Sequence, residues 1–409
     1  SSENGIHLDW STNIHVIHNR CFNNGKGIWL YQSDENVVRD NICRDNLLAG
    51  IALWSSDSNT VTKNNSTGNG YSGIYLQFSS DNDVVTNVCN LNGFSGIFLY
   101  VSTGNSITGN TCNNNTVDGI SLTEGSNGNT VNDNHCSYNI NAGISVISAN
   151  GNDISRNKVY VDINLSGVSY GFYLEYSDSN TLSGNFISSN SYGISMFYSS
   201  SNLVFHNCIR ADLIEAEDWY STYGNYWYHP VLLEGNSWFD YTGADLNGDG
   251  IGDTDIPWPG PGFDLYPLVI DSDGDGLSNC VERFIGTDPH NPDTDGDHFN
   301  DGDEWSLYHT DPLTPTSPQE AAEAINSRLQ DLVNSKHLAR NDAWPLKRKV
   351  DAAIALMNRG HWVGAAQKLS DFKKQVRAKI SSGALSQEDG ATLIAMAQGI
   401  IDAIQATQP

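Results

Sequence analysis

The chain has few basic residues and no long apolar run. It contains 21 Lys and Arg against 48 Asp and Glu, which gives a formal net charge of −27. Nucleic acids and acidic membrane surfaces attract cationic proteins, so this balance excludes both as partners. No stretch approaches the roughly 18 apolar residues that span a bilayer, which excludes a membrane span. With 10 Trp, 18 Tyr and 13 Phe the chain can build hydrophobic cores, so it is not disordered.

The 409 residues exceed the length of one ordinary domain, and the uneven charge indicates where the units lie. Residues 1–210 carry 8 basic and 16 acidic residues, residues 211–317 carry 1 and 23, and residues 318–409 carry 12 and 9. We predict a repeat domain over 1–210, a closing segment over 211–270, acidic repeats over 271–317 and a helical bundle over 318–409.

Two sequence signals recur in phase about every 23 residues over the first half of the chain. An Asn-x-apolar-x-x-Asn motif is one of them, as at Asn36–Asn41 and Asn202–Asn207. Apolar residues alternate within each unit, as in short strands, and Gly and Asn tolerate left-handed corners. The predicted fold class is mainly β, a right-handed parallel β-helix of about nine coils with Asn side chains bonded between coils. The other signal is a Gly-Ile or Gly-Phe pair at Gly5, Gly27, Gly50, Gly73, Gly96, Gly119, Gly143, Gly171 and Gly193.

Five cysteines share one position of the repeat, two residues after its second Asn. Val159 and Ile187 occupy that position in other coils, which predicts an inward column of buried free thiols. A disulfide between neighbours such as Cys21 and Cys43 is an alternative at coil spacing, although their side chains would point in parallel. A metal site has the least support, because no His shares the column. The five are Cys21, Cys43, Cys89, Cys112 and Cys136.

The residues two and four after each repeat Gly are expected to point outward, because those between them are apolar and point inward. In four successive coils these positions form what we call the aromatic strip. An exposed strip of this kind indicates an interface. Three interpretations remain open: sugar rings stack on it, another chain covers it, or another part of this chain folds over it. The aromatic strip comprises Trp29, Tyr31, Trp54, Tyr75, Phe98 and Tyr100.

An enzyme acting on polysaccharide is the rival expectation. Lyases and epimerases of uronic acids need cations, yet only eight Lys and Arg precede residue 211 and none is expected in the aromatic strip. Glycoside hydrolysis needs two carboxylates about 5–9.5 Å apart. Asp9 and Glu175 point outward but lie seven coils apart, and Asp118 and Glu124 are expected to be loop acids without a partner. An insertion around Val161–Tyr170 is the best place for a hidden site.

The acidic segment contains two loops with the spacing of calcium ligands. The motif D-x-D-x-D-G-x5-E supplies carboxylates at alternate positions, a main-chain carbonyl at the seventh and a two-oxygen Glu at the twelfth. We predict Ca2+ as the cofactor, the alternative being an acidic solvated linker whose carboxylates would repel one another. The first loop places the ligands at Asp271, Asp273, Asp275, Leu277, Asn279 and Glu282. The second places them at Asp293, Asp295, Asp297, Phe299, Asp301 and Glu304, with His298 where Gly is preferred.

A third loop is less complete. Ile256 stands at its twelfth position, so it would need an outside ligand such as Asp264 and bind weakly. The helices that flank the loop of an EF-hand are expected to be missing from the two loops of the acidic segment. The third loop offers Asp245, Asn247, Asp249, Ile251 and Asp253.

Apolar residues at helical spacing predict four helices after residue 317. Pro318 opens the first, the second follows Asp342, the third spans about Trp362–Ile380, and Ser386 caps the fourth. Gly360 and Gly383 end the preceding helices. These apolar residues are expected to form the core of the bundle.

Three segments resemble known families. The Gly-Ile and Asn-x-apolar-x-x-Asn units, together with the closing segment 236–268, resemble the NosD-type right-handed β-helix family. Residues 271–316, with their repeated Thr-Asp-Pro, resemble thrombospondin type 3 calcium repeats. Leu369-x-x-Phe372-x-x-x-Val376 and Ser382-Gly383-x-Leu385-Ser386 resemble the FIMAH-type helical domain. The first resemblance implies help in copper-enzyme maturation, which the three scattered Met residues do not support.

Together these observations predict a secreted or cell-surface protein of archaeal or bacterial type that works through contacts. It is expected to be a calcium-binding matrix, surface or filament protein whose partners are its own copies, surface proteins or a polysaccharide. The alternative is a polysaccharide lyase, epimerase or glycosidase, or a carbohydrate-binding module. Because Ser1 already lies inside a repeat, we expect that an upstream segment has been removed, and that residues 1–30 take part in a polar, calcium-dependent self-association.

Overall fold

The computed structural model describes residues 3–160, 169–241, 243–257 and 263–407. The chain divides into two compact units, Ser1–Val269 and Ile270–Pro409. Each unit is described by itself below. No helix among the described residues is both long and apolar enough to cross a membrane.

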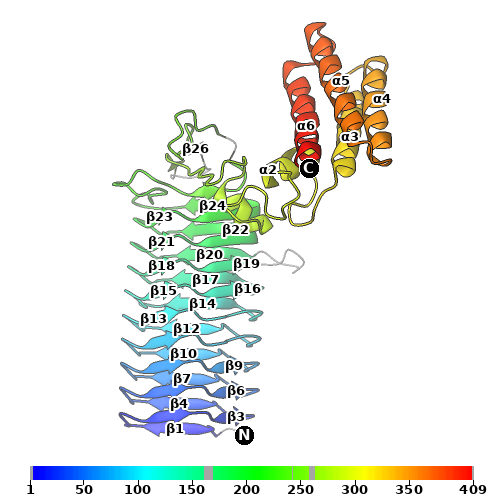
Figure 1. Cartoon of the computed structure of the whole chain (residues 1–409). Coiled ribbons are helices and arrows are strands. Elements are labelled where there is room, and N and C mark those ends of the chain that lie inside the picture. The colour runs from blue at the N-terminus through cyan, green and yellow to red at the C-terminus, as the bar shows by residue number, and fades with distance from the viewer. Residues whose placement is uncertain (1–2, 161–168, 242, 258–262, 408–409) are drawn as a thin grey trace. The chain divides into compact units, whose positions relative to one another are not determined.

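The first unit is a parallel β-solenoid of about nine coils, as predicted (Figure 1). Its largest sheet takes one strand from each coil, in the order β1 (Ile6–Asp9), β4 (Ile28–Tyr31), β7 (Ile51–Trp54), β10 (Ile74–Gln77), β12 (Ile97–Tyr100), β14 (Asp118–Thr123), β17 (Ala142–Ile147), β20 (Tyr170–Glu175) and β22 (Phe186–Phe197). β24 (Cys208–Trp219) extends it next to β22 and pairs with β25 (Ser237–Trp238), while β19 (Lys158–Tyr160) and β16 (His135–Ser137) join it through β22.

Two smaller sheets complete the coils. One contains β2 (His15–Ile17), β5 (Val37–Arg39), β8 (Thr60–Thr62), β11 (Asp83–Val85), β13 (Ser106–Thr108), β15 (Thr130–Asn132), β18 (Asp153–Ser155), β21 (Thr181–Ser183) and β23 (Leu203–Phe205). The other contains β3 (Arg20–Phe22), β6 (Ile42–Arg44) and β9 (Asn65–Thr67). A separate antiparallel pair, β26 (Ile256–Pro257) and β27 (Phe263–Asp264), follows in the closing segment.

Inward apolar columns fill the solenoid. The residues one and three after each repeat Gly point inward, and Ile28 and Leu30 are fully buried. The glycine itself is required by close packing, because a Cβ on Gly27 would lie 2.4 Å from the carbonyl oxygen of Gly50. The predicted cysteine column is confirmed: Cys21, Cys43, Cys89, Cys112 and Cys136 are free and buried.

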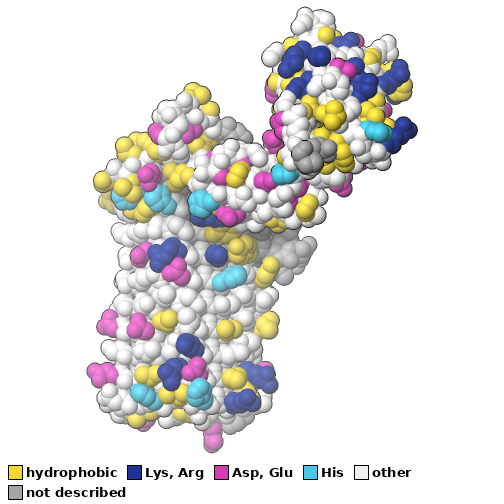
Figure 2. Space-filling model, viewed as in Figure 1, with side chains coloured by type: hydrophobic (Ala, Val, Ile, Leu, Met, Phe, Trp, Pro, Cys, Tyr) yellow, Lys and Arg dark blue, Asp and Glu magenta, His cyan; other side chains and the backbone are white. Residues whose placement is uncertain are grey.

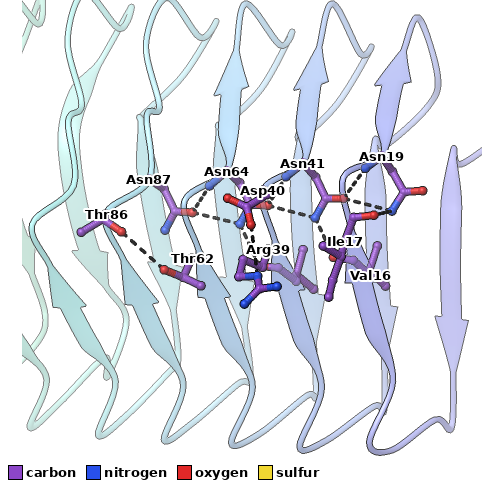
Figure 3. A network of polar contacts seen from close by, with 11 residues as sticks. Val16, Ile17, Asn19, Arg39, Asp40, Asn41, Thr62, Asn64, Thr86 and Asn87 are labelled. Atoms are coloured by element: carbon purple, nitrogen blue, oxygen red, sulfur yellow. Dashed lines mark hydrogen bonds and ion pairs between the residues drawn. The ribbon is translucent and has the colours of Figure 1, made fainter.

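Asparagine ladders bind each coil to the next (Figure 3). The backbone N–H and side-chain Nδ2 of Asn41 donate to Oδ1 of Asn64, at 2.9 and 3.0 Å. Nδ2 of Asn41 also donates to the carbonyl oxygen of Val16 at 2.8 Å, and Asn64 repeats the pattern with Asn87. A second predicted ladder runs through Asn36, Asn59, Asn82, Asn105, Asn129, Asn152, Asn180 and Asn202. A third, which was not predicted, runs through Asn24, Asn46, Asn69, Asn92, Asn115 and Asn139.

The ladder of Figure 3 ends on a buried carboxylate in the closing segment. Nδ2 of Asn207 donates to Oδ1 of Asn236 at 2.9 Å, and the backbone N–H of Asn236 donates to Oδ2 of Asp264 at 2.7 Å. The indole N–H of Trp238 donates to the same carboxylate oxygen at 2.8 Å. Burial raises the pKa of Asp264 to about 6. Asp264 is therefore engaged by the solenoid, and the prediction that it is an outside ligand of the loop at 245–253 is wrong.

The second unit joins the acidic segment to a four-helix bundle. Phe299 and Tyr308 belong to the bundle's hydrophobic core, and the Tyr308 hydroxyl donates to the carbonyl oxygen of Met396 at 2.7 Å. The bundle consists of α3 (Pro318–Asn334), α4 (Arg340–Met357), α5 (Trp362–Ser381) and α6 (Gln387–Ala406). α4 begins before Asp342, where it was expected to begin, and the other predicted starts are confirmed.

Short helices begin at the C-terminal end of both acidic loops. The prediction that flanking helices are missing is therefore wrong on the C-terminal side of each loop. α1 (Asn279–Ile285) starts inside the first loop, because the Ser278 side chain accepts from the backbone N–H of Val281 and caps it. α2 (Asp301–Asp303) continues into the π-helix η1 (Glu304–Tyr308) after the second loop.

The ladder predicts a strong dependence of stability on one internal amide. Replacing Asn87 by Ala removes its side-chain bonds to Asn110, Val61 and Asn64 and leaves the Val61 carbonyl and the Asn64 backbone N–H without this partner, each at about 1–3 kcal/mol. Chemical denaturation should therefore show a loss of several kcal/mol. Asn65, which is exposed, is the matched control: Asn65→Ala should change the free energy of unfolding little. Equal losses in the two variants would contradict the account.

Candidate functional site

The strand register brings the aromatic strip together. Two outward columns run across β4, β7, β10 and β12. One contains Trp29, Ala52, Tyr75 and Phe98, and the other Tyr31, Trp54, Gln77 and Tyr100. Their outward orientation is as predicted. Whether the strip binds a partner stays a prediction.

The rings of the strip also pack on one another. Tyr75 and Phe98 stack with their centroids 5.3 Å apart, and burial raises the pKa of Tyr75 to about 12. Phe98 is only 8% exposed because Tyr71 and Phe94 also contact it. Trp54 is 38% exposed and is the most accessible ring. The strip is thus a preorganised, half-buried aromatic surface.

One cation does join the aromatic strip, contrary to the prediction. Lys26 Nζ lies 4.1 Å from the centroid of the Trp29 ring. Lys26 immediately precedes Gly27, and its long side chain places the amine over the Trp29 ring on β4. Burial lowers the pKa of this amine.

Farther along the same outer face lies what we call the acidic end, carried by β20, β22 and β24. One column there contains Tyr173, Ser195 and Glu217, and the next contains Glu175, Phe197 and Trp219. The Tyr173 hydroxyl donates to Glu175 at 3.1 Å. Glu217 is 8% exposed and accepts from the Ser195 hydroxyl at 2.5 Å and the Trp219 indole N–H at 3.1 Å.

The two carboxylates of the acidic end lie on one face, two strands apart. Burial raises the pKa of Tyr173, and the charges of Glu175 and Glu217 raise it further. Glu175 was compared only with the distant Asp9, whereas β24, two strands from β20, adds Glu217 to the same face. No Gly-Ile pair marks β24, so only its alternation, Ala216 inward and Glu217 outward, could have revealed it.

Exposed tyrosines border the acidic end. Tyr176, Tyr198 and Tyr220 occupy successive turns directly after the Glu175 column. Their rings stack, with centroids 5.0 and 4.8 Å apart, and they are 55%, 46% and 66% exposed. The outer face therefore carries aromatic surface at both ends.

The other candidate acids of the solenoid have structural roles. Asp118 was expected in a loop but begins β14 and is buried. It accepts from Asn141 and Ser145 at 2.7 and 2.8 Å, and burial raises its pKa. Burial and Asp240 together raise the pKa of Glu215 to about 9. Of the insertion around Val161–Tyr170, residues 161–168 lie outside the described part of the chain.

The acidic loops bring carboxylates within 4.8 Å of one another in three groups. These are Asp271, Asp273 and Asp275; Asp275, Glu282 and Asp301; and Asp293, Asp295 and Asp297. Asp301, assigned to the second loop, thus meets the first loop. The loops touch there, since the backbone N–H of Gly302 donates to Asp275 Oδ2 at 2.9 Å. The clusters could bind metal ions.

Buried carboxylate oxygens in these loops lack partners among the described residues. Both oxygens of Glu282 and one each of Asp273, Asp295 and Glu304 make no hydrogen bond. Burial and neighbouring acids raise the pKa of Glu282, and likewise that of Glu304, to about 7. Unpaired buried carboxylates of this kind fit a divalent cation with oxygen ligands.

Other predicted ligands are placed differently. The side chain of Asn279 bonds with Ser272 across the first loop, and its role as a ligand stays a prediction. Leu277 and Phe299 have buried side chains, and the prediction that their main-chain carbonyls bind the ion stays a prediction. In the third loop, Asp245 accepts from the backbone of Gly248 and Gly250, and no described group of three acids forms there.

Family models match the chain in the order predicted. The chain belongs to the family described as periplasmic copper-binding protein (NosD), whose model matches residues 1–139 and 92–243. The bacterial TSP3 repeat model matches residues 271–292 and 293–315, and the FIMAH domain model matches residues 322–402. No curated protein gives a match.

Solved structures share the solenoid fold at low identity. The A-module of a mannuronan C-5 epimerase from Azotobacter vinelandii is 18% identical, with a TM-score of 0.42 over 50% of this chain and 68% of that chain. The Dettilon tailspike protein is 19% identical, with a TM-score of 0.43 over 52% and 44%. A mutant periplasmic alginate epimerase is 15% identical, with a TM-score of 0.34 over 51% of this chain and 62% of its own length. These likenesses carry no argument about activity.

The described residues do not fit a copper site of imidazole and thioether ligands. Met196 lies inside the solenoid core, and Met357 and Met396 lie inside the helical core. The metal-ligating groups found among the described residues contain only carboxylates, which suit hard cations instead.

Proposed function

We propose that the protein is an extracellular polysaccharide-binding protein whose glycan lies along the outer face of the large sheet. The observation that carries this proposal is the pair of in-register aromatic columns on β4, β7, β10 and β12. Sugar rings bury apolar faces on such side chains while their hydroxyls reach polar groups at the edges.

The spacing and chemistry of the face favour a glycan over a protein partner. Successive coils lie about 4.8 Å apart, which is close to the length of one sugar unit in an extended chain. Beyond the strip the columns continue through Ser121, Thr123 and Ser145 to the acidic end. Ser121 and Ser145 are buried and bonded to each other, so the partly exposed acceptors that follow the rings are Thr123 and Glu175. Only eight Lys and Arg precede residue 211, which disfavours polyuronates, and Figure 2 shows the charged side chains of one face of the solenoid.

Removing the most exposed ring tests this proposal. Affinity electrophoresis first identifies the soluble neutral polysaccharide that retards the native protein most. Trp54→Ala should weaken binding to that polysaccharide tenfold, which corresponds to about 1.4 kcal/mol. Melting should change little, because Trp54 is partly exposed. Trp344→Ala, on the helical bundle, is the matched control and should bind as the native protein does.

Three results would contradict glycan binding. One is the absence of retardation in every neutral polysaccharide tried. Another is a native oligomer that Trp54→Ala dissociates, which would identify the strip as a contact between copies. The third is unfolding of the Trp54→Ala variant, which would show that the strip is covered within the chain.

The proposal includes two calcium sites in the acidic loops. Asp271, Asp273, Asp275 and Glu282 would hold one ion with help from Asp301. The second loop would hold another through Asp293, Asp295, Asp297 and Glu304. The ions would neutralise carboxylates that otherwise keep one another from ionising. Exposed sites of this type fill where calcium is abundant, which supports an extracellular location.

Calcium should stabilise the second unit. At a calcium concentration of 100 times Kd, binding adds about 2.7 kcal/mol to the free energy of unfolding. Calorimetry should show this gain for the native protein and a much smaller gain for Glu282→Gln, which removes a carboxylate that has no other partner. Glu323→Gln, on the surface of α3, is the control. Unchanged melting and protease sensitivity in EDTA would refute calcium binding.

The acidic end favours glycoside hydrolysis as a second candidate function. Glu175 accepts from the Tyr173 hydroxyl, Glu217 lies two strands away on the same face, and the two carboxylates differ in burial. One carboxylic acid would protonate the glycosidic oxygen while the other carboxylate activates water for attack at the anomeric carbon. Water is the only other reactant, and a free reducing end is a product.

A reducing-end assay on the polysaccharide that the native protein binds tests hydrolysis. Glu217→Gln and Glu175→Gln should each lower the rate by about 100-fold or more while keeping binding. Glu124→Gln, at an exposed turn, should retain the native rate. Hydrolysis would be refuted if the native protein released no new reducing ends, or if all variants gave equal rates. The protein would then be a binding protein without this activity.

A further inference from the structure

The helical bundle carries a cationic surface that lies outside the outer face of the solenoid and the acidic loops. Residues 340–381, which form α4, α5 and the turn between them, contain 10 basic and 3 acidic residues, a net charge of +7. The rest of the chain contains 11 basic and 45 acidic residues, a net charge of −34. Figure 2 shows Lys and Arg side chains gathered on the bundle. In a chain this acidic, one strongly positive pair of helices favours an anionic partner at that place.

Most of these cations are not neutralised within the bundle. The three acids of residues 340–381 each pair with one lysine. The other seven cations, four of them arginines, make no ion pair among the described residues, and the four arginines are all exposed. Exposed arginines without an acid partner are available to bind anions. The three ion pairs are Asp342 with Lys379, Asp351 with Lys347 and Asp371 with Lys374.

Two of these arginines flank an exposed tryptophan on one side of α4. Arg340, Trp344 and Arg348, which we call the cationic stripe, are spaced by four residues, so their side chains leave the helix on the same side. All three are exposed, Trp344 to 62%. At 1.5 Å per residue the two arginines lie about 12 Å apart along the helix axis. Arg340 is the first residue of α4, where its charge opposes the helix dipole, so helix stability does not account for it.

A groove of about 160 Å3 runs beside the cationic stripe, between α3 and α4. Arg340, Trp344 and Lys347 line it from α4. From α3 it receives the apolar side chain of Leu329 and the exposed amide of Gln330. The groove therefore places an aromatic ring, an amide and cations side by side. A sugar ring with a carboxylate offers the matching groups, namely an apolar face, hydroxyls and a negative charge.

The density of charge on the cationic stripe distinguishes among polyanions. A DNA duplex carries one charge per about 1.7 Å of its axis, far more than two guanidinium groups about 12 Å apart would neutralise. Uronic acid polysaccharides carry at most one carboxylate per sugar ring, and the faces of their rings can stack on an indole. We propose that the cationic stripe binds an acidic polysaccharide. One ring lies on Trp344, and carboxylates of the rings on either side accept from Arg340 and Arg348.

This site does not depend on the proposed outer face of the solenoid. Only eight Lys and Arg precede residue 211, so the solenoid suits a neutral polymer, whereas the cationic stripe needs carboxylates that a neutral polymer lacks. The two sites would therefore not compete for one ligand. If both bind, one chain connects a neutral polysaccharide to an acidic one.

Isothermal titration calorimetry of the full chain tests the proposal. The probes are hyaluronate fragments, with one carboxylate on every second ring, and oligogalacturonates, with one on every ring. At saturating calcium and low salt the native protein should bind at least one probe, and binding should weaken as salt rises because exposed charges are screened. Arg340→Gln and Trp344→Ala should each weaken binding about tenfold. Only Arg340→Gln should also reduce the dependence on salt, because Trp344 contributes a ring contact without charge.

Two control variants separate the cationic stripe from other causes of binding. Arg377→Gln removes an exposed arginine of α5 and should bind the probes as the native protein does. Trp54→Ala, which impairs the proposed outer-face site, should also bind them normally, whereas Trp344→Ala should keep the binding of neutral polysaccharide. Failure of the outer-face proposal would leave these expectations for the acidic probes unchanged.

Four results overturn the proposal. One is no binding of either probe at low salt. Another is the same affinity in Arg340→Gln and Arg377→Gln: an equal loss would show a general attraction by net charge, and no loss in either would show calcium bridging at the acidic loops. A third is tighter binding of a DNA duplex than of either probe. The fourth is a native oligomer that Trp344→Ala dissociates, which would make the cationic stripe a contact between copies.

Discussion

The asparagine ladders are the interaction on which the rest of the solenoid depends. Each ladder amide donates from Nδ2 to the Oδ1 of the next coil and accepts at its own Oδ1 from the preceding coil, as Asn41 does between Asn19 and Asn64. Corners held this way leave little freedom for a strand to slip. A slip by one residue would turn the outward columns inward. The alignment of Tyr75 with Phe98, and of Ser195 with Glu217, therefore follows from the ladders and the buried apolar columns beneath them.

The second unit is organised by charge instead. Its acidic loops bury Glu282 and Glu304 among other carboxylates, which raises the pKa of each to about 7. A carboxylate with a raised pKa destabilises the fold progressively as pH rises from its unfolded value near 4.5 through about 7. A bound divalent cation would remove this cost, and the loops pack against the bundle through Phe299 and Tyr308. The proposed cation binding would therefore be coupled to the order of the bundle.

The repeat was predictable from sequence because one coil is a local pattern. Gly27 and Gly50, or Asn41 and Asn64, identify a coil and its neighbour without knowledge of distant contacts. The acidic end was missed because β24 has no Gly-Ile pair and enters the face only through pairing with β22. Asp301 joined Asp275 and Glu282 because the two loops pack together, which spacing within one loop cannot reveal. Asp264 was assigned to a metal because its role as the end of a ladder depends on Asn236, far away in sequence.

The central claim is that a polysaccharide lies along the outer face of the large sheet. From β4 to β24 this face extends about 38 Å at the usual strand spacing. The most direct test is to measure affinity against oligosaccharide length, using a ladder of fragments of the bound polysaccharide. Affinity should rise with each added sugar until the fragment spans the face, and then level off. Equal affinity for the shortest and longest fragments would contradict an extended site.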